Sequence, residues 1–137
     1  MGGRMPFSID PLVGGLQNVL DLRLQQHALT SSNLANADTP NYKAKVIDFT
    51  RILSRAMGET PALQLTDPRH IEAGGLDPHH PTVETIEPLA WSLDGNSVIP
   101  ERETARLQAN ALMYQAVAEG LDHKLTMLRF AASDGRA

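Results

Sequence analysis

The last third of the chain carries the pattern that most restricts its fold. Within residues 101–132, eight apolar or aromatic side chains alternate at spacings of four and three. They are Leu107, Ala111, Tyr114, Ala118, Leu121, Leu125, Leu128 and Ala132. This spacing is typical of a long helix that packs against another helix along a narrow seam. We therefore predict a helix over 101–132, which Pro100 precedes as a helix-starting residue.

A second helical pattern lies near the beginning of the chain, over residues 12–36. Its apolar stripe has a period of seven, and neighbouring leucines widen it. The stripe consists of Val13, Leu16, Leu20, Leu24, His27 and Leu34. His27 lies on this stripe, so we expect a packed histidine there and not a metal ligand. Pro40 restricts Thr39 to extended conformations and therefore ends the helix near residue 36.

These two helices predict a mainly α fold in which long N- and C-terminal helices pack as an antiparallel coiled-coil-like hairpin. Asp48 is suited to cap a short third helix, with Gly58 at its other end. Apolar residues at helical spacing follow the cap: Phe49, Ile52, Leu53 and Ala56. We expect residues 1–57 and 101–137 to form one discontinuous helical domain.

Residues 58–100 have a different composition. They hold six of the nine prolines, a Gly74-Gly75 pair and most of the net negative charge. No periodic pattern persists, which predicts a long irregular excursion. Residues 89–93 alternate well enough for a short strand before an Asp94-Gly95 turn, so we expect a small β element near 89–98.

The composition excludes several classes of function. A net charge of −4 with no basic run argues against nucleic-acid binding. The absence of cysteine excludes disulfides and thiol nucleophiles. No apolar run is long enough to span a membrane. The first fifteen residues lack an uninterrupted apolar stretch, so we expect no cleavable signal peptide and a different export route.

No catalytic, cofactor or metal site is predicted. Phosphate-binding loops, dinucleotide fingerprints, nucleophile elbows and zinc-protease motifs are all missing from the sequence. The loop histidines His70, His79 and His80 match no convincing metal-ligand spacing. Glu101 and Glu103 are interpreted as acidic residues at the start of a helix, where they favour the helix dipole.

Aromatic residues make up only 4% of the chain, so its core must be aliphatic and thin. A lone hairpin of two narrow stripes buries too little apolar surface to offset the entropy of ordering the whole chain. We infer that the helical ends gain order when neighbouring copies pack around them.

The stretch SSNLANADTPNYKAKVIDF resembles the signature N-[IL]-A-N-x-x-T-P-G-Y of bacterial flagellar rod, hook and related axial proteins. The segments LDLRLQQHALTSSNLAN and GNSVIPERETARLQANALMYQAVAEGL resemble the B-type subunits of the proximal rod, whose C-type sibling is the alternative. The resemblance covers about 16–57 and 95–132. Asn41 stands where the family has Gly, and Asn tolerates the same positive φ.

The resemblance implies a structural subunit of the basal-body rod that crosses the periplasm. Such subunits leave the cytoplasm unfolded through the flagellar type III apparatus and assemble helically around the export channel, where they transmit torque for motility. The implied partners are other copies, other rod proteins, and inner-membrane ring and export-gate components at the rod base.

The resemblance also points to two sets of assembly residues. A corner that ends the first helix comprises Asn33, Asn36, Asp38, Thr39, Pro40, Asn41 and Tyr42. A helical seam comprises Leu16, Leu20, Leu24, Leu34, Leu107, Tyr114, Leu121, Leu125 and Leu128. The two Asn side chains of the corner are expected to cap the helix, to bond neighbouring subunits, or simply to terminate the helix. Tyr42 is expected to wedge between neighbours.

Two other functions remain as alternatives. A soluble helical adaptor or export-chaperone-like module of the flagellar system would fold alone and melt cooperatively. A rod-associated muramidase would need catalytic carboxylates in a folded lobe, for which the Pro-rich residues 58–100 are a poor candidate.

Overall fold

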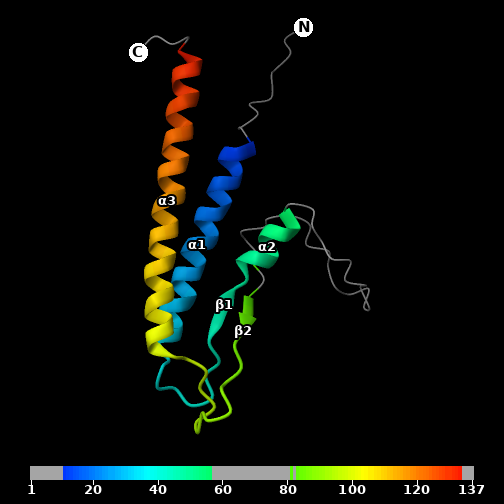
Figure 1. The fold of residues 1–137 in the computed structure, drawn as a ribbon, viewed down its shortest axis with the longest axis vertical. Coiled ribbons are helices and arrows are strands. Elements are labelled where there is room, and N and C mark those ends of the chain that lie inside the picture. Colours follow the sequence, from blue (N-terminus) through cyan, green and yellow to red (C-terminus); the bar gives the residue numbers. More distant parts are fainter. Residues whose placement is uncertain (1–10, 57–80, 82, 134–137) are drawn as a thin grey trace, which may run out of the picture.

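A computed structural model describes residues 11–56, 81 and 83–133 of the chain. Three helices and two short strands occur in these residues (Figure 1). They are α1 (Pro11–Ala35), β1 (Lys45–Ile47), α2 (Phe49–Ala56), β2 (Val83–Thr85) and α3 (Pro100–Ala132). The predicted mainly α architecture is confirmed.

The two long helices pack side by side and run in opposite directions (Figure 1). The first turn of α1 and the last turn of α3 lie at the same end of the molecule. The helix α3 has 33 residues and α1 has 25, so α3 extends past the first turn of α1. The predicted antiparallel hairpin is therefore present, and its two helices differ in length.

The strands β1 and β2 form an antiparallel pair in which Val46 lies opposite Glu84. The expectation of a short strand within 89–98 is wrong. The strand β2 lies at residues 83–85, and a turn follows at Leu89 to Ser92. The apolar alternation at 89–93 misled the prediction, since most of those side chains are exposed and do not line a sheet face.

Local sequence signals place the helix ends correctly. The Asp48 carboxylate accepts a hydrogen bond from the Arg51 backbone N–H at 3.0 Å, which confirms the predicted N-cap of α2. Pro100 is the first residue of α3. The backbone N–H at this position has no partner within a helix, so a proline costs no hydrogen bond there. The predicted C-cap Gly58 lies outside the described residues.

The apolar core is small and lies between α1, β1 and α2. Leu22, Ile47 and Ile52 are buried together, and Leu29 and Phe49 pack against them. This thin aliphatic core agrees with the low aromatic content.

One expectation for α1 is wrong, because His27 is exposed and not packed. The buried positions of α1 after its first turn lie on a different stripe: Leu22, Gln26, Thr30 and Asn33. Three of these four are polar, so the true inner face was invisible to a search for apolar periodicity. His27 lies beside that face and points to solvent.

Candidate assembly site

The corner begins where α1 ends in a chain of local hydrogen bonds. The Asn36 side-chain amide donates to the Ser32 carbonyl at 2.8 Å, and the Thr39 hydroxyl donates to Asn36 Oδ1 at 3.1 Å. The Tyr42 N–H then donates to the Thr39 carbonyl at 3.3 Å and closes a tight turn. Asn41 has φ = 60°, which confirms that it adopts the conformation expected of the family's Gly.

A second segment, residues 94–97, forms hydrogen bonds with this corner although it lies much later in the sequence. We call these contacts the clasp. The Asn96 side-chain amide donates to three carbonyls, those of Asn36 and Ala37 at 2.9 Å and that of Thr39 at 2.8 Å. These carbonyls lie in the turn that directly follows α1, where those of Asn36 and Thr39 also accept backbone N–H groups. The buried Asn96 amide therefore caps α1 from 60 residues away.

The clasp requires glycine at position 95. Gly95 has φ = 72°, and a Cβ built there would lie 2.6 Å from Asn41 Oδ1. Backbone bonds tie the two loops together on either side, from the Asn41 N–H to the Asp94 carbonyl at 2.8 Å and from the Ser97 N–H to the Tyr42 carbonyl at 3.0 Å. A side chain at position 95 would displace the Asn41 side chain and would have to adopt a left-handed φ.

We expect Gly95→Ala to lower the free energy of unfolding by about 1–3 kcal/mol, because it combines a left-handed φ with the close approach of Asn41. Urea unfolding followed by circular dichroism measures this change. The matched control is Gly120→Ala in α3, where an added Cβ meets nothing within 4 Å and Ala raises helix propensity. Equal unfolding midpoints for the two variants would contradict the clasp.

Asn33 lies at the centre of the site and is fully buried. Its Nδ2 donates to the Lys45 carbonyl at 2.8 Å and to Glu103 Oε2 at 2.9 Å. Its Oδ1 accepts from the Lys45 N–H at 2.9 Å and from the Tyr42 hydroxyl at 3.3 Å. One amide therefore joins α1, the corner, β1 and α3, with all of its donors and acceptors used.

The same helix satisfies the free edge of β1. Gln26 Oε1 accepts a hydrogen bond from the Ile47 N–H at 2.8 Å, and the Gln26 side-chain N–H donates to the Thr30 hydroxyl at 2.8 Å. The opposite edge of the strand faces β2, since the Ile86 N–H donates to the Ala44 carbonyl at 2.8 Å. A two-stranded ribbon alone is marginally stable, so the side chains of α1 act in place of a third strand.

Buried polar contacts also join α3 to α1. Glu103 is buried and forms an ion pair with Arg106 at 2.5 Å in addition to its bond from Asn33. The Asn110 amide donates to the Arg23 backbone carbonyl at 2.7 Å. Such contacts fix the register of the two helices, because a shift of either helix would leave buried polar groups without partners.

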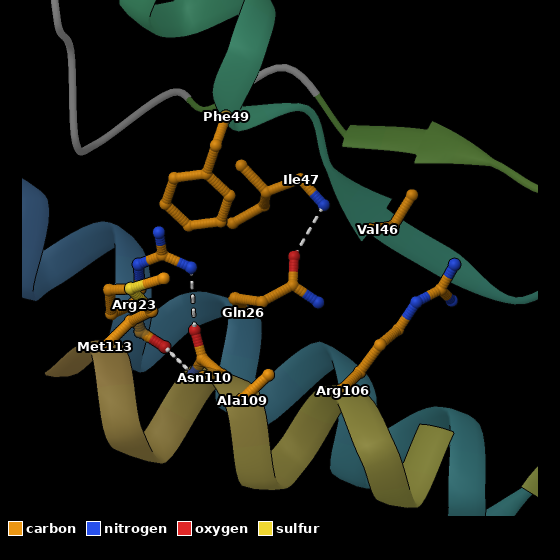
Figure 2. Close-up of a pocket in the computed structure, with 9 residues that line it drawn as sticks. All are labelled: Arg23, Gln26, Val46, Ile47, Phe49, Arg106, Ala109, Asn110 and Met113. Carbon is orange, nitrogen blue, oxygen red and sulfur yellow. Dashed lines mark hydrogen bonds between the residues drawn. The ribbon is translucent and has the colours of Figure 1, made fainter. Parts of the chain in front are cut away.

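An open groove of about 230 Å³ lies between the helix pair and the strand β1 (Figure 2). Its walls are mostly apolar, and Arg23 and Arg106 lie at its two ends with Gln26 between them. The lining residues are Arg23, Gln26, Val46, Ile47, Phe49, Arg106, Ala109, Asn110 and Met113. The Arg23 guanidinium stacks on the Phe49 ring at 3.9 Å from its centroid.

The structure separates the predicted seam residues into two groups. Six are partly buried: Leu16, Leu20, Leu34, Leu107, Tyr114 and Leu121. The other three are exposed: Leu24, Leu125 and Leu128. Of the corner residues, Asn33 is buried, Asn36 and Tyr42 are partly buried, and the other four are exposed. Asn33 links the corner to α3 through Glu103, which belongs to neither set.

Comparison with known proteins reveals relatives along most of the chain. A family model described as "Flagella basal body rod protein" matches residues 17–43, which include the whole corner. The flagellar basal body rod protein FlgB of Yersinia enterocolitica is 40% identical over 78% of this chain and 85% of its own length. FlgB of Escherichia coli K12 is 36% identical over 80% of this chain and 83% of its own length.

The chain belongs to the FlgB family of flagellar basal body rod proteins.

The relatedness extends beyond enterobacteria, since FlgB of Bacillus subtilis is 29% identical over 90% of this chain and 95% of its own length. The resemblance to the B-type rod subunits is confirmed. As a FlgB family member, the chain is a structural subunit of the flagellar basal-body rod with a role in motility. Its relatives are structural rod proteins, and their family implies contact with other rod components.

The described residues of this FlgB family chain hold no group of three or more His, Cys, Asp or Glu side chains arranged to bind a metal ion. The histidines His70, His79 and His80 lie outside those residues. None of the helices in the described ranges has the length and apolarity needed to cross a bilayer.

Sequence reasoning missed the polar residues that organise the FlgB site: Gln26, Thr30, Asn96, Glu103 and Asn110. A usable signal existed for two of them. Glu103, Leu107, Asn110 and Tyr114 follow one another at spacings of four, three and four, which is a second register of the same helical pattern. Polar residues within such a pattern indicate buried hydrogen bonds that fix register.

Proposed function

We propose that the chain is a subunit of the proximal rod, where it assembles helically around the export channel and transmits torque. The observation that carries this proposal is the apolar surface that α3 leaves exposed. Its large exposed side chains are Leu112, Met113, Leu125, Met127, Leu128 and Phe130. A single chain rarely exposes so many large apolar side chains on one helix unless another molecule covers them.

The unequal lengths of α1 and α3 support the same proposal. Leu125 and Leu128 keep the seam spacing and are exposed. The last turns of α3 extend past the first turn of α1 (Figure 1). Neighbouring copies or other rod proteins would cover this extension. We propose the seam as the inner contact layer of the rod, with the exposed residues of the corner facing other subunits.

We propose two different roles for the residues of the corner, one within the subunit and one in contacts with neighbours. Asn33 uses its whole amide inside the subunit, so its role is to aim β1 away from α1. Asp38, Thr39, Pro40 and Asn41 are exposed. We propose these four as the part of the corner that contacts neighbours.

The domain organisation is proposed on the same contacts. Residues 1–57 and 101–137 form one discontinuous helical unit, which the packing of α1 against α3 and β1 supports. Residues 58–100 form an excursion, of which β2 and the Asn96 loop return to that unit. The inner-membrane ring and export gate are the proposed partners at the rod base, and export without a cleavable signal is the proposed route to the periplasm.

Fractionation of cells tests the proposed function. We expect the chain to remain in isolated basal bodies after a high-salt wash. Its contacts bury apolar surface, and salt strengthens hydrophobic association. The purified chain, when dilute, is expected to have lower helicity than the 66 helical residues of the structure predict. A chain that stays in the cytoplasm and is already fully helical when dilute would instead be a soluble adaptor.

A further inference from the structure

The loop over residues 89–93 exposes three large apolar side chains at alternate positions of the sequence. Trp91, the only tryptophan of the chain, is 72% exposed, Leu93 is fully exposed and Leu89 is nearly half exposed. The loop is a defined turn, since the Ser92 N–H donates to the Leu89 carbonyl at 2.8 Å and the Ser92 hydroxyl to the Asn96 carbonyl at 2.9 Å. The fold therefore presents these side chains to solvent on a fixed support. We call residues 89–93 the Trp91 loop.

The groove of Figure 2 contains a cation without a counter-charge. Among the residues that the structure describes, no carboxylate forms an ion pair with Arg23. Within the part of the chain that the structure describes, the Arg23 side chain makes one long hydrogen bond of 3.4 Å to Asn110 Oδ1, and its buried Nε has no partner there. Burial lowers the pKa of Arg23, which reflects the cost of desolvating the guanidinium. A carboxylate entering the groove would offset that cost.

The Trp91 loop matches the groove in charge and in apolar character. Asp94 follows the loop directly, and its carboxylate forms no ion pair within the described ranges. Glu87 precedes the loop and is paired with Lys43. The loop therefore offers apolar side chains and one uncompensated carboxylate, and the groove offers apolar walls and one uncompensated cation.

We propose that the Trp91 loop of one copy docks in the groove of a second copy, with Trp91 against Phe49 and Met113 and Asp94 beside Arg23. This inference rests on the proposed function, because it names a contact between rod subunits. Loop and groove are different surfaces of the protein, so the contact is heterologous. A row of copies joined in this way keeps a free loop at one end and a free groove at the other. Repetition of such a contact gives an open helical array.

The position of the loop favours a second copy as the occupant. Figure 1 shows the loop at the end of the molecule where α3 begins. The groove lies farther along α3, at Arg106 to Met113, and is bounded by β1 and the start of α2. Copies that follow one another in the same direction would bring the loop of one toward the groove of the next.

Disulfide trapping tests this contact cleanly, because the chain has no cysteine of its own. Cells produce two tagged copies together, one with Trp91→Cys and one with Met113→Cys, and basal bodies are isolated and oxidised. Both positions are exposed, so neither substitution disturbs the core. We expect a product of twice 14.9 kDa that carries both tags. The control pairs Trp91→Cys with Gln108→Cys, an exposed position on another face of α3, and should give little product.

Three outcomes would overturn the inference while leaving the proposed function intact. Rods that contain both variants without a mixed product would show that the loop contacts something else, such as another rod protein. Dimers formed by each variant with itself would indicate a symmetric contact. A chain carrying both substitutions that closes only an internal disulfide would show that its own loop fills its groove.

A measurement on the purified full chain covers the case in which the cysteine variants do not enter rods. We expect Trp91→Ala to weaken self-association roughly tenfold or more in sedimentation equilibrium, as truncation of a buried interface tryptophan does. Its unfolding midpoint should stay unchanged, since Trp91 is exposed in the free chain. Gln108→Ala, at an exposed polar position of α3 outside the groove, is the matched control. Unchanged association of the Trp91 variant, or a wild-type chain that stays monomeric in concentrated solution, counts against the docking.

Discussion

Asn33→Asp is expected to lower the free energy of unfolding by roughly 3–5 kcal/mol, although the two side chains have nearly the same shape. The substitution removes both donors of the amide, so the Lys45 carbonyl and Glu103 lose their bonds from α1. It also places a second carboxylate at the 2.9 Å contact with buried Glu103. Because small domains are stable by only about 5–15 kcal/mol, this change removes a large share of the total stability. Urea and thermal unfolding, followed by circular dichroism, measure it.

Two further variants separate this effect from a general loss of an asparagine. Asn36→Asp alters a more exposed amide that donates only to the Ser32 carbonyl, so we expect it to cost less than about 1 kcal/mol. Adding Glu103→Gln to the Asn33 variant supplies a donor in place of the repelling carboxylate. The double variant should therefore recover part of the lost stability. If it is no more stable than the single variant, the direct coupling between positions 33 and 103 is refuted.

Leu128→Asp is expected to abolish motility without unfolding the chain. Leu128 is 38% exposed in the isolated subunit, so a charge there is tolerated while the chain is free. In the proposed rod the same position is covered by neighbouring subunits, and a carboxylate buried there without a partner is strongly unfavourable. Swimming in soft agar and electron microscopy of basal bodies measure the effect. We expect non-swimming cells whose basal bodies lack a rod beyond the base.

The matched control for this experiment is Thr126→Asp, two residues earlier on another face of α3 and also exposed. It introduces the same charge at nearly the same height, so it should preserve most of the swimming. Secretion of both variants should remain normal if export acts on the unfolded chain. Wild-type swimming by the Leu128 variant would remove this part of the seam from the assembly surface.

The helices themselves were predictable because their signals are local. The seam spacing, Pro100 and the Asp48 cap each act within a few residues, and they placed α1, α2 and α3 close to their observed bounds. The positive φ of Asn41 was also predictable, since a turn after Thr-Pro requires it and only Gly and Asn adopt it readily. The sequence by itself therefore determined the helical hairpin, the corner and, through its motif, the family.

Only the tertiary structure decided which face of each helix is inner. Gln26, Asn33 and Glu103 occupy the inner face although their polarity predicts solvent, because α1, β1 and α3 supply one another with partners from 12 to 70 residues away. Thr30 is buried beside them through its hydrogen bonds with Gln26. The same long-range pairing placed the second strand at 83–85 and set Asn96 as the cap of α1. Burial of a polar group is favourable only when its partner is present. That partner is known only once the chain has folded, so a local pattern can mark a buried polar position such as Glu103 but cannot identify its partner.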